Sequence, residues 1–452
     1  MDIDLTADYM GVEFKNPLIL GMAGLCFPLR YIQKAINAGI AGIALKGGFE
    51  GIKRSPNTTS MEESGPRPYM VSLRKLGMPG GDWYGSELRQ FTKAWVEHER
   101  PEVIKLAKAN NVRLGAGDQG GEEGGRWAAE MLQADWIQSA YSCPVLAGQD
   151  PYTNYPTSEE CNDWREKQYG TRKNRGYVKY DYESFLGAKK TGLPVDVKIG
   201  STRDLGVIPE KARLLEKLGA DGLCPMNYFS CGVVIDVDTE TLWGWPSFAG
   251  YHLGRAFKPV ALYTAAECLI NTKLPVSGIG GIWTARDALE FLLLGCSTVQ
   301  LCSGVYMQGW KRGIADVLDG IKKWMDEHGY GTIKEFKGKI MKDYQAGKYQ
   351  AWGEYKYQNV DTSFNGGWIS PTPIFPVIDQ QRCTFCGDCQ SYCVYEAITV
   401  DTTTNQWRHR RDYCQGCGMC VSICPVDCLS LQDDQNRVVW SGKGYAKTYF
   451  KM

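Results

Sequence analysis

The sequence has no excess of charge of either sign, because its 452 residues include 51 Lys and Arg and 51 Asp and Glu. This balance gives no electrostatic reason to expect a nucleic acid or a membrane surface as a partner. No run of about eighteen apolar residues is present, and no basic segment followed by an apolar core stands at the N-terminus. We therefore expect a globular cytoplasmic protein.

Two further patterns are missing. No GxGxxG motif starts after a candidate strand, because the one occurrence, at 115–120, begins inside the candidate strand 112–116, so the chain is not expected to bind a dinucleotide itself. None of the 4 histidines lies in a catalytic pattern. Any catalysis is therefore expected to depend on other side chains or on a bound group.

Cysteine, in contrast, is plentiful and ordered near the C-terminus. The pattern CxxCxxCxxxC occurs twice, and its eight thiolates suit two [4Fe–4S] clusters. In the bacterial ferredoxin arrangement the fourth cysteine of each run binds the other cluster. This crossover predicts one set of Cys383, Cys386, Cys389 and Cys424 and a second set of Cys414, Cys417, Cys420 and Cys393.

The alternatives are two zinc ribbons or a disulfide scaffold. Zinc sites use paired CxxC knuckles with a longer spacer, whereas a triple CxxCxxC run crowds three ligands together and suits a cubane better. The second run ends in Cys424-Pro425, as such motifs do, but the first is followed by Val394. This difference changes no ligand.

The first 330 residues alternate short apolar runs with amphipathic stretches. Eight runs are candidate strands, and they are 17–23, 40–46, 112–116, 135–140, 195–199, 222–226, 276–279 and 298–302. Continuous hydrophobicity is typical of parallel strands that are buried on both faces. Eight βα units in about 300 residues indicate a (β/α)8 TIM barrel, an α/β fold, with a doubly wound sheet as the alternative.

The domain organisation follows from these patterns. We expect a barrel over 1–330, a connector over 331–376 and a ferredoxin-type domain over 377–452. Two insertions, 47–100 and 146–190, follow the second and fourth strands. They are candidates for lids or partner contacts, or are solvated excursions.

The seventh and eighth strands end in glycine-rich segments, 276–282 and 295–305. Backbone N–H groups at such strand ends can close on a phosphate, although an ordinary tight turn has the same composition. Lys46 and Lys198 end the second and fifth strands, where an ammonium group could stabilise negative charge on a reduced flavin or form a salt bridge.

Taken in order, these residues resemble the dihydroorotate dehydrogenase superfamily, and within it the catalytic half of dihydropyrimidine dehydrogenase. The similarity covers nearly the whole chain and includes 8–17, Ser142-Cys143-Pro144, Val197-Lys198, Met226-Asn227, both glycine motifs and the tandem cysteine motifs. It implies FMN in the barrel, held by Ala23, Gly24, Lys46, Lys198, Asn227, Gly278, Gly280, Gly281, Cys302 and Ser303. It also implies substrate contacts from Glu87, Ser142, Asn227 and Tyr228, with Cys143 as the proton donor or acceptor.

A thiol suits the role of Cys143, since the saturated carbon of a dihydro substrate exchanges a proton on the face opposite the flavin. A small buried hydrophobe is the alternative for this cysteine.

The substrate pocket departs from the family pattern. Ala140 and Gly85 replace asparagines that pair with the pyrimidine ring, and Met226 and Tyr228 stand where threonines are usual. An amide edge buried without a partner costs about 1–3 kcal/mol, so a pyrimidine should bind weakly. The Gly-Gln-Asp-Pro motif at 148–151 also follows Cys143 almost at once, which predicts an altered gate.

We expect an FMN and iron–sulfur oxidoreductase that reduces or forms a C=C bond next to a carbonyl in a small cyclic substrate. An NAD(P)H-oxidising flavoprotein subunit or a ferredoxin would be its electron-transfer partner, in an oligomer. The alternative is an electron-transfer or assembly subunit whose barrel is degenerate.

Overall fold

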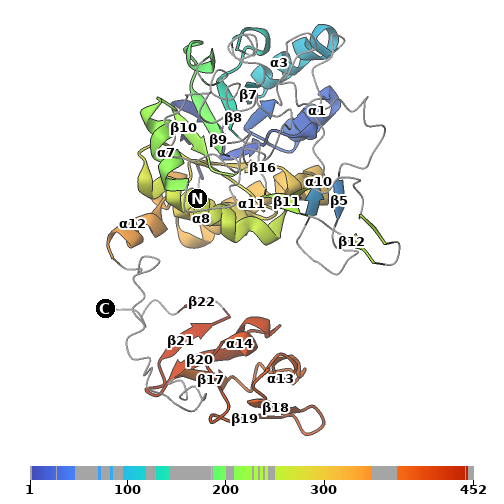
Figure 1. Cartoon of the computed structure of the whole chain (residues 1–452), viewed down its shortest axis with the longest axis vertical. Coiled ribbons are helices and arrows are strands. Elements are labelled where there is room, and N and C mark those ends of the chain that lie inside the picture. The colour runs from blue at the N-terminus through green and yellow to red at the C-terminus, as the bar shows by residue number, and fades with distance from the viewer. Residues whose placement is uncertain are drawn as a thin grey trace, which may run out of the picture. The chain divides into compact units, whose positions relative to one another are not determined.

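The computed structural model covers the whole chain and describes most of it (Figure 1). The described residues are 3–26, 28–45, 70–72, 82–84, 95–118, 126, 129–141, 185, 187–199, 208–226, 229–232, 235–237, 240–242, 250–347, 374–442 and 444–445. The chain forms two compact units, Met1–Lys342 and Asp343–Met452, and each is described by itself. Within those ranges no helix is long and apolar enough to cross a membrane.

Eight parallel strands form one sheet in the first unit. They are β3 (Leu18–Leu20), β4 (Gly42–Leu45), β7 (Arg113–Asp118), β8 (Trp136–Tyr141), β9 (Val195–Ile199), β10 (Gly222–Cys224), β15 (Ser277–Ile279) and β16 (Thr298–Leu301). The order is β10-β9-β8-β7-β4-β3-β16-β15, and every pair is parallel.

The two end strands of this sheet also meet. Leu223 of β10 forms a parallel bridge with Val276, and its N–H donates to the carbonyl oxygen of Pro275 at 3.0 Å. An open doubly wound sheet has no such contact between its edges. The predicted TIM barrel is therefore confirmed.

Helices follow the strands around the outside of this sheet (Figure 1). The α-helices are α1 (Leu29–Asn37), α3 (Arg100–Ala109), α7 (Ile208–Lys217), α8 (Lys258–Asn271), α9 (Ala285–Leu294), α10 (Ser303–Trp310), α11 (Asp316–His328) and α12 (Lys339–Gln345). Short 3-10 helices are η1 (Gly24–Cys26), η6 (Arg255–Phe257) and η8 (Ile333–Glu335), and π-helical turns are η3 (Trp95–Glu99) and η7 (Lys311–Ala315). Thr284 and Asp287 form a capping box that starts α9.

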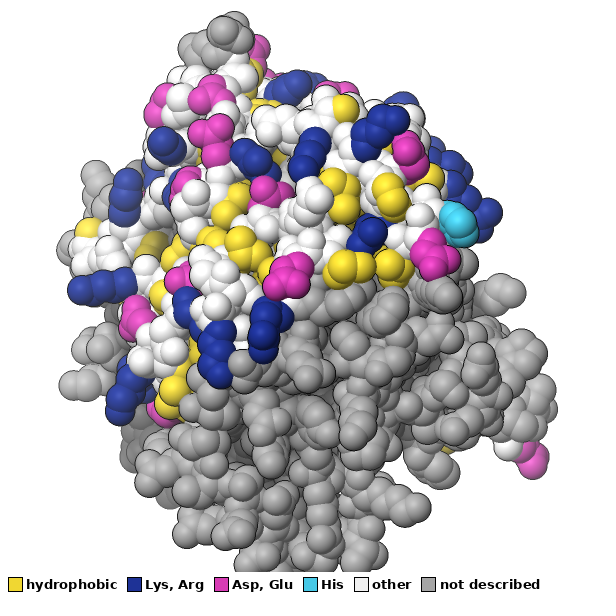
Figure 2. Space-filling view, turned by 90° about the horizontal axis from the view of Figure 1, so that it is seen from above, with side chains coloured by type: hydrophobic (Ala, Val, Ile, Leu, Met, Phe, Trp, Pro, Cys, Tyr) yellow, Lys and Arg dark blue, Asp and Glu magenta, His cyan; other side chains and the backbone are white. Residues whose placement is uncertain are grey.

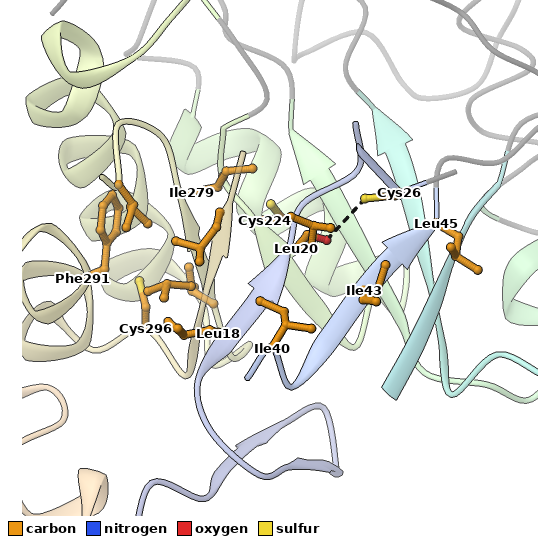
Figure 3. Close-up of a cluster of buried hydrophobic side chains, with 14 of the residues drawn as sticks. Leu18, Leu20, Cys26, Ile40, Ile43, Leu45, Cys224, Ile279, Phe291 and Cys296 are labelled. Carbon is orange, nitrogen blue, oxygen red and sulfur yellow. Dashed lines mark hydrogen bonds between the residues drawn. The ribbon is translucent and has the colours of Figure 1, made fainter. Parts of the chain in front are cut away.

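Apolar side chains fill the layer between strands and helices. Figure 3 shows part of this cluster, in which Leu18, Leu20, Ile43 and Leu45 of the strands are buried together with Phe291 of α9. On the outer face, Lys and Arg side chains are intermixed with Asp and Glu over the described part of the surface in Figure 2. The barrel thus has an apolar core and, on the described part of the face shown, a surface of mixed charge.

An N-terminal hairpin closes the bottom of the barrel. It consists of β1 (Ala7–Tyr9) and β2 (Val12–Phe14), and both Tyr9 and Phe14 are fully buried. Phe14 packs edge-to-face on Trp136, with ring centroids 5.5 Å apart. Gly115 leaves room for the Trp136 ring, because an added Cβ there would overlap it.

Two loops of the barrel join in a second sheet. The insertion after β4 provides β5 (Met70–Ser72) and β6 (Asp82–Tyr84), and the segment after β10 provides β11 (Phe229–Gly232) and β14 (Gly250–Leu253). The antiparallel order β11-β14-β6-β5 links the two loops, and β12 (Ile235–Asp236) pairs with β13 (Thr241–Leu242). The sequence did not indicate this third insertion, between β10 and α8.

The second unit has a small antiparallel fold. Its sheets are β17-β20-β21-β22 (Ile374–Ile378, Leu429–Asp433, Val438–Ser441, Gly444–Tyr445) and β18-β19 (Ile398–Asp401, Gln406–His409), with helices α13 (Asp388–Ser391) and α14 (Met419–Ile423). Ile398, Val421, Leu429 and Leu431 form its core.

The structure places the first part of the expected connector in the first unit. Ile333 and Phe336 are buried in the barrel core, which explains why the unit extends to Lys342. The rest of 331–376 lies largely outside the described residues, so the other domain boundaries stay predictions.

The substitution Gly115→Ala should lower the free energy of unfolding by about 1–3 kcal/mol, because its Cβ overfills a packed interior. Urea unfolding of the purified protein measures this. In a Trp136→Leu background the same substitution should cost much less. Equal costs in the two backgrounds would contradict the packing argument.

Candidate functional site

The ends of β15 and β16 form a backbone cradle in the first unit. Gly280 and Gly281 have φ values of 114° and 71°, which other residues rarely adopt. The turn that they form packs against the start of α10, where an added Cβ at Gly304 would overlap the carbonyl oxygen of Ile282. Such a turn beside a helix N-terminus offers N–H groups to a phosphate.

Side chains hold this cradle in place. The indole N–H of Trp283 donates to Oγ of Ser303 at 3.2 Å, and Gln308 donates to the carbonyl oxygen of Trp283 at 2.8 Å. Cys302 is the N-cap residue of α10. Gly278 lies in β15, two residues before Gly280. The side chain of Phe291 in α9 fills the space that a Cβ at Gly278 would need. Helix packing therefore accounts for Gly278.

The end of β3 lies next to this cradle in the strand order. Ala23 is buried and Gly24 begins η1, four residues after the end of β3 at Leu20. The thiol of Cys26 lies 3.2 Å from the carbonyl oxygen of Gly21 and 3.9 Å from that of Leu20, the contact drawn in Figure 3. These residues fix the turn that leaves β3.

Lys198 is the one predicted lysine that the structure describes. It is only 3% exposed, near the C-terminal end of β9, and it pairs with Ala140 of β8 and Cys224 of β10. Side chains alternate along a strand, so Lys198 shares its face with Asp196. Because Val195, Val197 and Ile199 belong to the core cluster of the outer layer, this polar face is the barrel interior.

Asp196 forms a buried polar network below Lys198. Its Oδ2 accepts hydrogen bonds from the phenol of Tyr9 at 3.1 Å and from the amide of Gln138 at 2.9 Å. Burial raises the pKa of Asp196 to about 7, although these hydrogen bonds and the charge of Lys198 act in the opposite direction. The network therefore holds a carboxyl group that can be protonated near neutral pH.

Several amide and carboxyl atoms in this interior lack partners among the described residues. They are both polar side-chain atoms of Gln300, Oε1 of Gln138 and Oδ1 of Asp196. Gln300 is 1% exposed, in β16 beside the end of β3. A buried polar atom without a partner costs about 1–3 kcal/mol, so these atoms call for ordered water or a bound polar ring. Together with the cradle and Lys198, they fit a flavin with a phosphate group.

Other predicted site residues lie outside the described residues: Lys46, Glu87, Ser142, Cys143, Asn227 and Tyr228. Four of these positions nonetheless follow described strand ends closely. Lys46 comes directly after β4, Ser142 and Cys143 directly after β8, and Asn227 three residues after β10. The carboxyl ends of parallel barrel strands meet at one face, where barrel enzymes have their active sites.

Two cavities lie in the second unit, and each holds one of the two predicted sets of four cysteines. The first cavity is lined by Cys383, Cys386, Cys389 and Cys424, and by a fifth cysteine, Cys428. The second is lined by Cys393, Cys414, Cys417 and Cys420. The two cysteine motifs do not include Cys428, but its position four residues after Cys424 was a signal for this contact.

Backbone N–H groups point at the sulfur atoms in a repeated pattern. Those of Phe385 and Gly416 lie 3.3 and 3.4 Å from the sulfurs of Cys383 and Cys414, each two residues earlier. Those of Ala397 and Cys428 make the same contact with the fourth cysteine of each run. Such hydrogen bonds stabilise thiolate ligands.

The donor set suits iron–sulfur clusters. Burial raises the pKa of Cys420 to about 12 and that of Cys389 and Cys414 above the ordinary value, so these thiols need a bound metal to ionise. Among the described side chains, no three His, Cys, Asp or Glu residues are placed to hold a single metal ion. Thiolates spread around a cavity fit a cubane better than a tetrahedral zinc ion.

Comparison with known proteins gives two family matches. Residues 158–325 match the family model of dihydroorotate dehydrogenase, and residues 376–431 match that of the 4Fe-4S dicluster domain. The "NAD-dependent dihydropyrimidine dehydrogenase subunit PreA" of Escherichia coli (strain K12) is 25% identical over 444 residues, which cover 95% of each chain.

Two other relatives match parts of the chain. The catalytic subunit of dihydroorotate dehydrogenase B (NAD(+)) of Pyrococcus abyssi is 28% identical over 347 residues, 75% of this chain and 99% of that one. The chloroplastic dihydropyrimidine dehydrogenase (NADP(+)) of Arabidopsis thaliana is 34% identical over 165 residues, 34% of this chain and 37% of that one. These matches confirm the resemblance that the sequence motifs indicate.

Pairs of cysteine substitutions test the two cavities. Cys393→Ala combined with Cys414→Ala removes two ligands of one cavity, so about half of the iron should remain. Cys393→Ala combined with Cys383→Ala removes one ligand from each cavity, so most of the iron should be lost. Iron and sulfide analysis of anaerobically purified protein distinguishes the outcomes, and the reverse ranking would contradict the crossover.

The pKa of Asp196 predicts a pH-dependent stability. An unfolded aspartate has a pKa near 3.9, so between pH 4 and 7 the folded protein holds a proton that the unfolded chain has released. Wild-type stability should therefore fall with rising pH in this window, by up to about 1.4 kcal/mol per pH unit.

Asp196→Asn removes this proton uptake. The free energy of unfolding of the variant relative to wild type should rise from pH 4 to 7 and level off above, as followed by urea unfolding and circular dichroism. Parallel curves for the two proteins would contradict a raised pKa.

Proposed function

We propose that the chain is a member of the dihydroorotate dehydrogenase superfamily with a 4Fe-4S dicluster domain, and that it binds FMN and one [4Fe–4S] cluster in each of its two cysteine cavities. It is an oxidoreductase that acts on CH–CH groups. The observation that carries the proposal is the presence, in one chain, of a glycine-rich backbone cradle at the end of a barrel and of two sets of four cysteines around cavities. FMN supplies the exchange between two-electron chemistry on carbon and the one-electron steps of clusters.

The residues of the barrel would divide this work. We assign FMN contacts to the cradle residues Gly280, Gly281, Cys302 and Ser303, to Lys46 and Lys198, and to Ala23, Gly24, Gly278 and Asn227. The ammonium of Lys198 is buried, so its positive charge acts in a medium of low dielectric. The side-chain amide of Gln300 would form hydrogen bonds with the polar edge of the ring, because it has no hydrogen-bond partner among the described residues.

Cys143 would exchange a proton with the saturated carbon of the substrate. It comes two residues after the end of β8, at the face where the strand ends meet. A thiol with an ordinary pKa near 8.5 can serve as either acid or base close to neutral pH. Glu87, Ser142, Asn227 and Tyr228 are the proposed substrate contacts.

The substrate would be a small cyclic compound with a carbonyl next to the C=C bond, similar to a pyrimidine. Ala140 stands where the family has an asparagine, so this position provides no amide to a substrate ring. Met226 is 3% exposed and its sulfur lies near Gly280. These apolar residues favour a substrate with fewer hydrogen-bonding groups than uracil.

The proposal includes a partner and a compartment. The Escherichia coli relative is named as a subunit of an NAD-dependent enzyme, and the GxGxxG pattern of this chain, at 115–120, begins inside β7 instead of after a strand. An NAD(P)H-oxidising flavoprotein subunit, or a ferredoxin, would therefore exchange electrons with it, within an oligomer. A reducing compartment, the cytoplasm, would keep the cluster cysteines as thiols until iron binds.

Ala140 and Gly85 favour one other function, that of an electron-transfer or assembly subunit without chemistry in the barrel. The intact polar interior and cradle weigh against it, because buried atoms without partners are costly in a barrel that binds nothing. Turnover of the Cys143 variants separates the two functions.

The test uses anaerobically purified protein reduced with dithionite, to which uracil, thymine and a panel of cyclic enones are added. We expect an enone to reoxidise the flavin more than a pyrimidine does, which is seen as recovery of the flavin absorbance. Cys143→Ala should slow this reoxidation by about 10²–10⁴-fold at unchanged flavin and iron content.

Cys161→Ala, at a cysteine without an assigned role, serves as the matched control and should leave the rate unchanged. Reoxidation by Cys143→Ala at the wild-type rate would contradict the role of this thiol. No response to any compound in the panel would favour the electron-transfer subunit.

A further inference from the structure

The first cysteine cavity has one thiol more than a cubane needs. Cys428 lines this cavity together with the four predicted ligands, and it is only 5% exposed. Its sulfur lies 3.4 Å from that of Cys424. The fifth thiol is thus in direct contact with one of the four ligand sulfurs.

The second cavity lacks this thiol at the matching position. Cys393 and Cys424 are the fourth cysteines of the two runs, and Ala397 and Cys428 follow them by four residues. The backbone N–H groups of Ala397 and Cys428 contact the sulfurs of those cysteines at 3.3 and 3.4 Å. Ala397 lines the second cavity and is 1% exposed. At this position the two cavities therefore share the backbone contact and differ by one sulfur atom.

The direction of the sulfur–sulfur hydrogen bond follows from the chemistry of the ligand. A cysteine that binds iron has lost its proton, so the bond must run from the S–H group of Cys428 to the sulfur of Cys424. A cluster gains one negative charge on reduction, and a donor at its sulfur stabilises that charge. The low dielectric around a buried thiol increases this effect.

We propose that Cys428 binds no iron and raises the reduction potential of the cluster held by Cys383, Cys386, Cys389 and Cys424. The inference rests on the proposed function, which assigns one cluster to each cavity. It makes Cys428 a residue that acts through the ligand Cys424. The two clusters, which have nearly the same ligands, thereby differ in reduction potential. The cluster of the first cavity accepts an electron more readily than that of the second.

The test is a redox titration of the full chain, followed by electron paramagnetic resonance. Cys428→Ala should lower the midpoint potential of one cluster and leave the other unchanged, with the full iron content. We expect about a tenfold change in the ratio of reduced to oxidised cluster at a fixed potential, which corresponds to about 59 mV for one electron. Cys428→Ser keeps a hydrogen-bond donor and should lie closer to wild type.

Ala397→Cys is the matched variant, since it adds a thiol to the second cavity and should raise the other midpoint. Unchanged midpoints in Cys428→Ala at full iron content would overturn the inference. Loss of half of the iron in Cys428→Ala would also overturn it, because Cys428 would then be a ligand. A Cys428→Ser midpoint equal to that of Cys428→Ala would assign the effect to packing and contradict the hydrogen bond.

The proposed function fails in a different way. Wild-type protein that binds no iron and gives no cluster signal after reduction would contradict the assignment of clusters to the cavities, whatever the variants do.

Discussion

Closure of the parallel sheet is the constraint on which the barrel site depends. The contact of Leu223 with Val276 joins β10 to β15, so all eight strand ends are held around one face. Residues separated by more than a hundred positions, such as Lys198 and Ser303, are thereby brought to the same end of the barrel. The sheet formed by β6 and β14 uses the same closure, because it joins loops that leave two different strands.

The barrel interior contains buried polar side chains. The strands are apolar toward the helices, but Gln138, Asp196, Lys198 and Gln300 occupy positions that a purely structural barrel would fill with aliphatic side chains. Tyr9 of the N-terminal hairpin donates a hydrogen bond to one of the two carboxyl oxygens of Asp196. The atoms of Gln138, Asp196 and Gln300 that have no partner among the described residues lie in the barrel interior. A bound flavin or ordered water would offset their desolvation, and this links the stability of the core to the proposed cofactor.

The sequence predicted what depends on local pattern. Apolar runs located all eight strands, with β9 at its predicted bounds, and cysteine spacing was sufficient for the two sets because the crossover is a property of the motif. The strands β11 and β14 were missed, since each has four residues and β14 pairs with β6, a segment far away in the sequence. The Tyr9–Asp196 contact was missed for the same reason, although the alternation Val-Asp-Val-Lys at 195–198 marked a polar inner face. How the predicted residues divide FMN and substrate contacts stays a prediction.

The central claim is that one chain stores electrons in a flavin and in two clusters. A reductive titration of the anaerobic wild-type protein, with iron and flavin content measured on the same sample, tests it most directly. We predict uptake of about four electrons per chain, two for FMN and one for each cluster. Uptake of only about two electrons per chain, in protein that contains FMN, would contradict the claim.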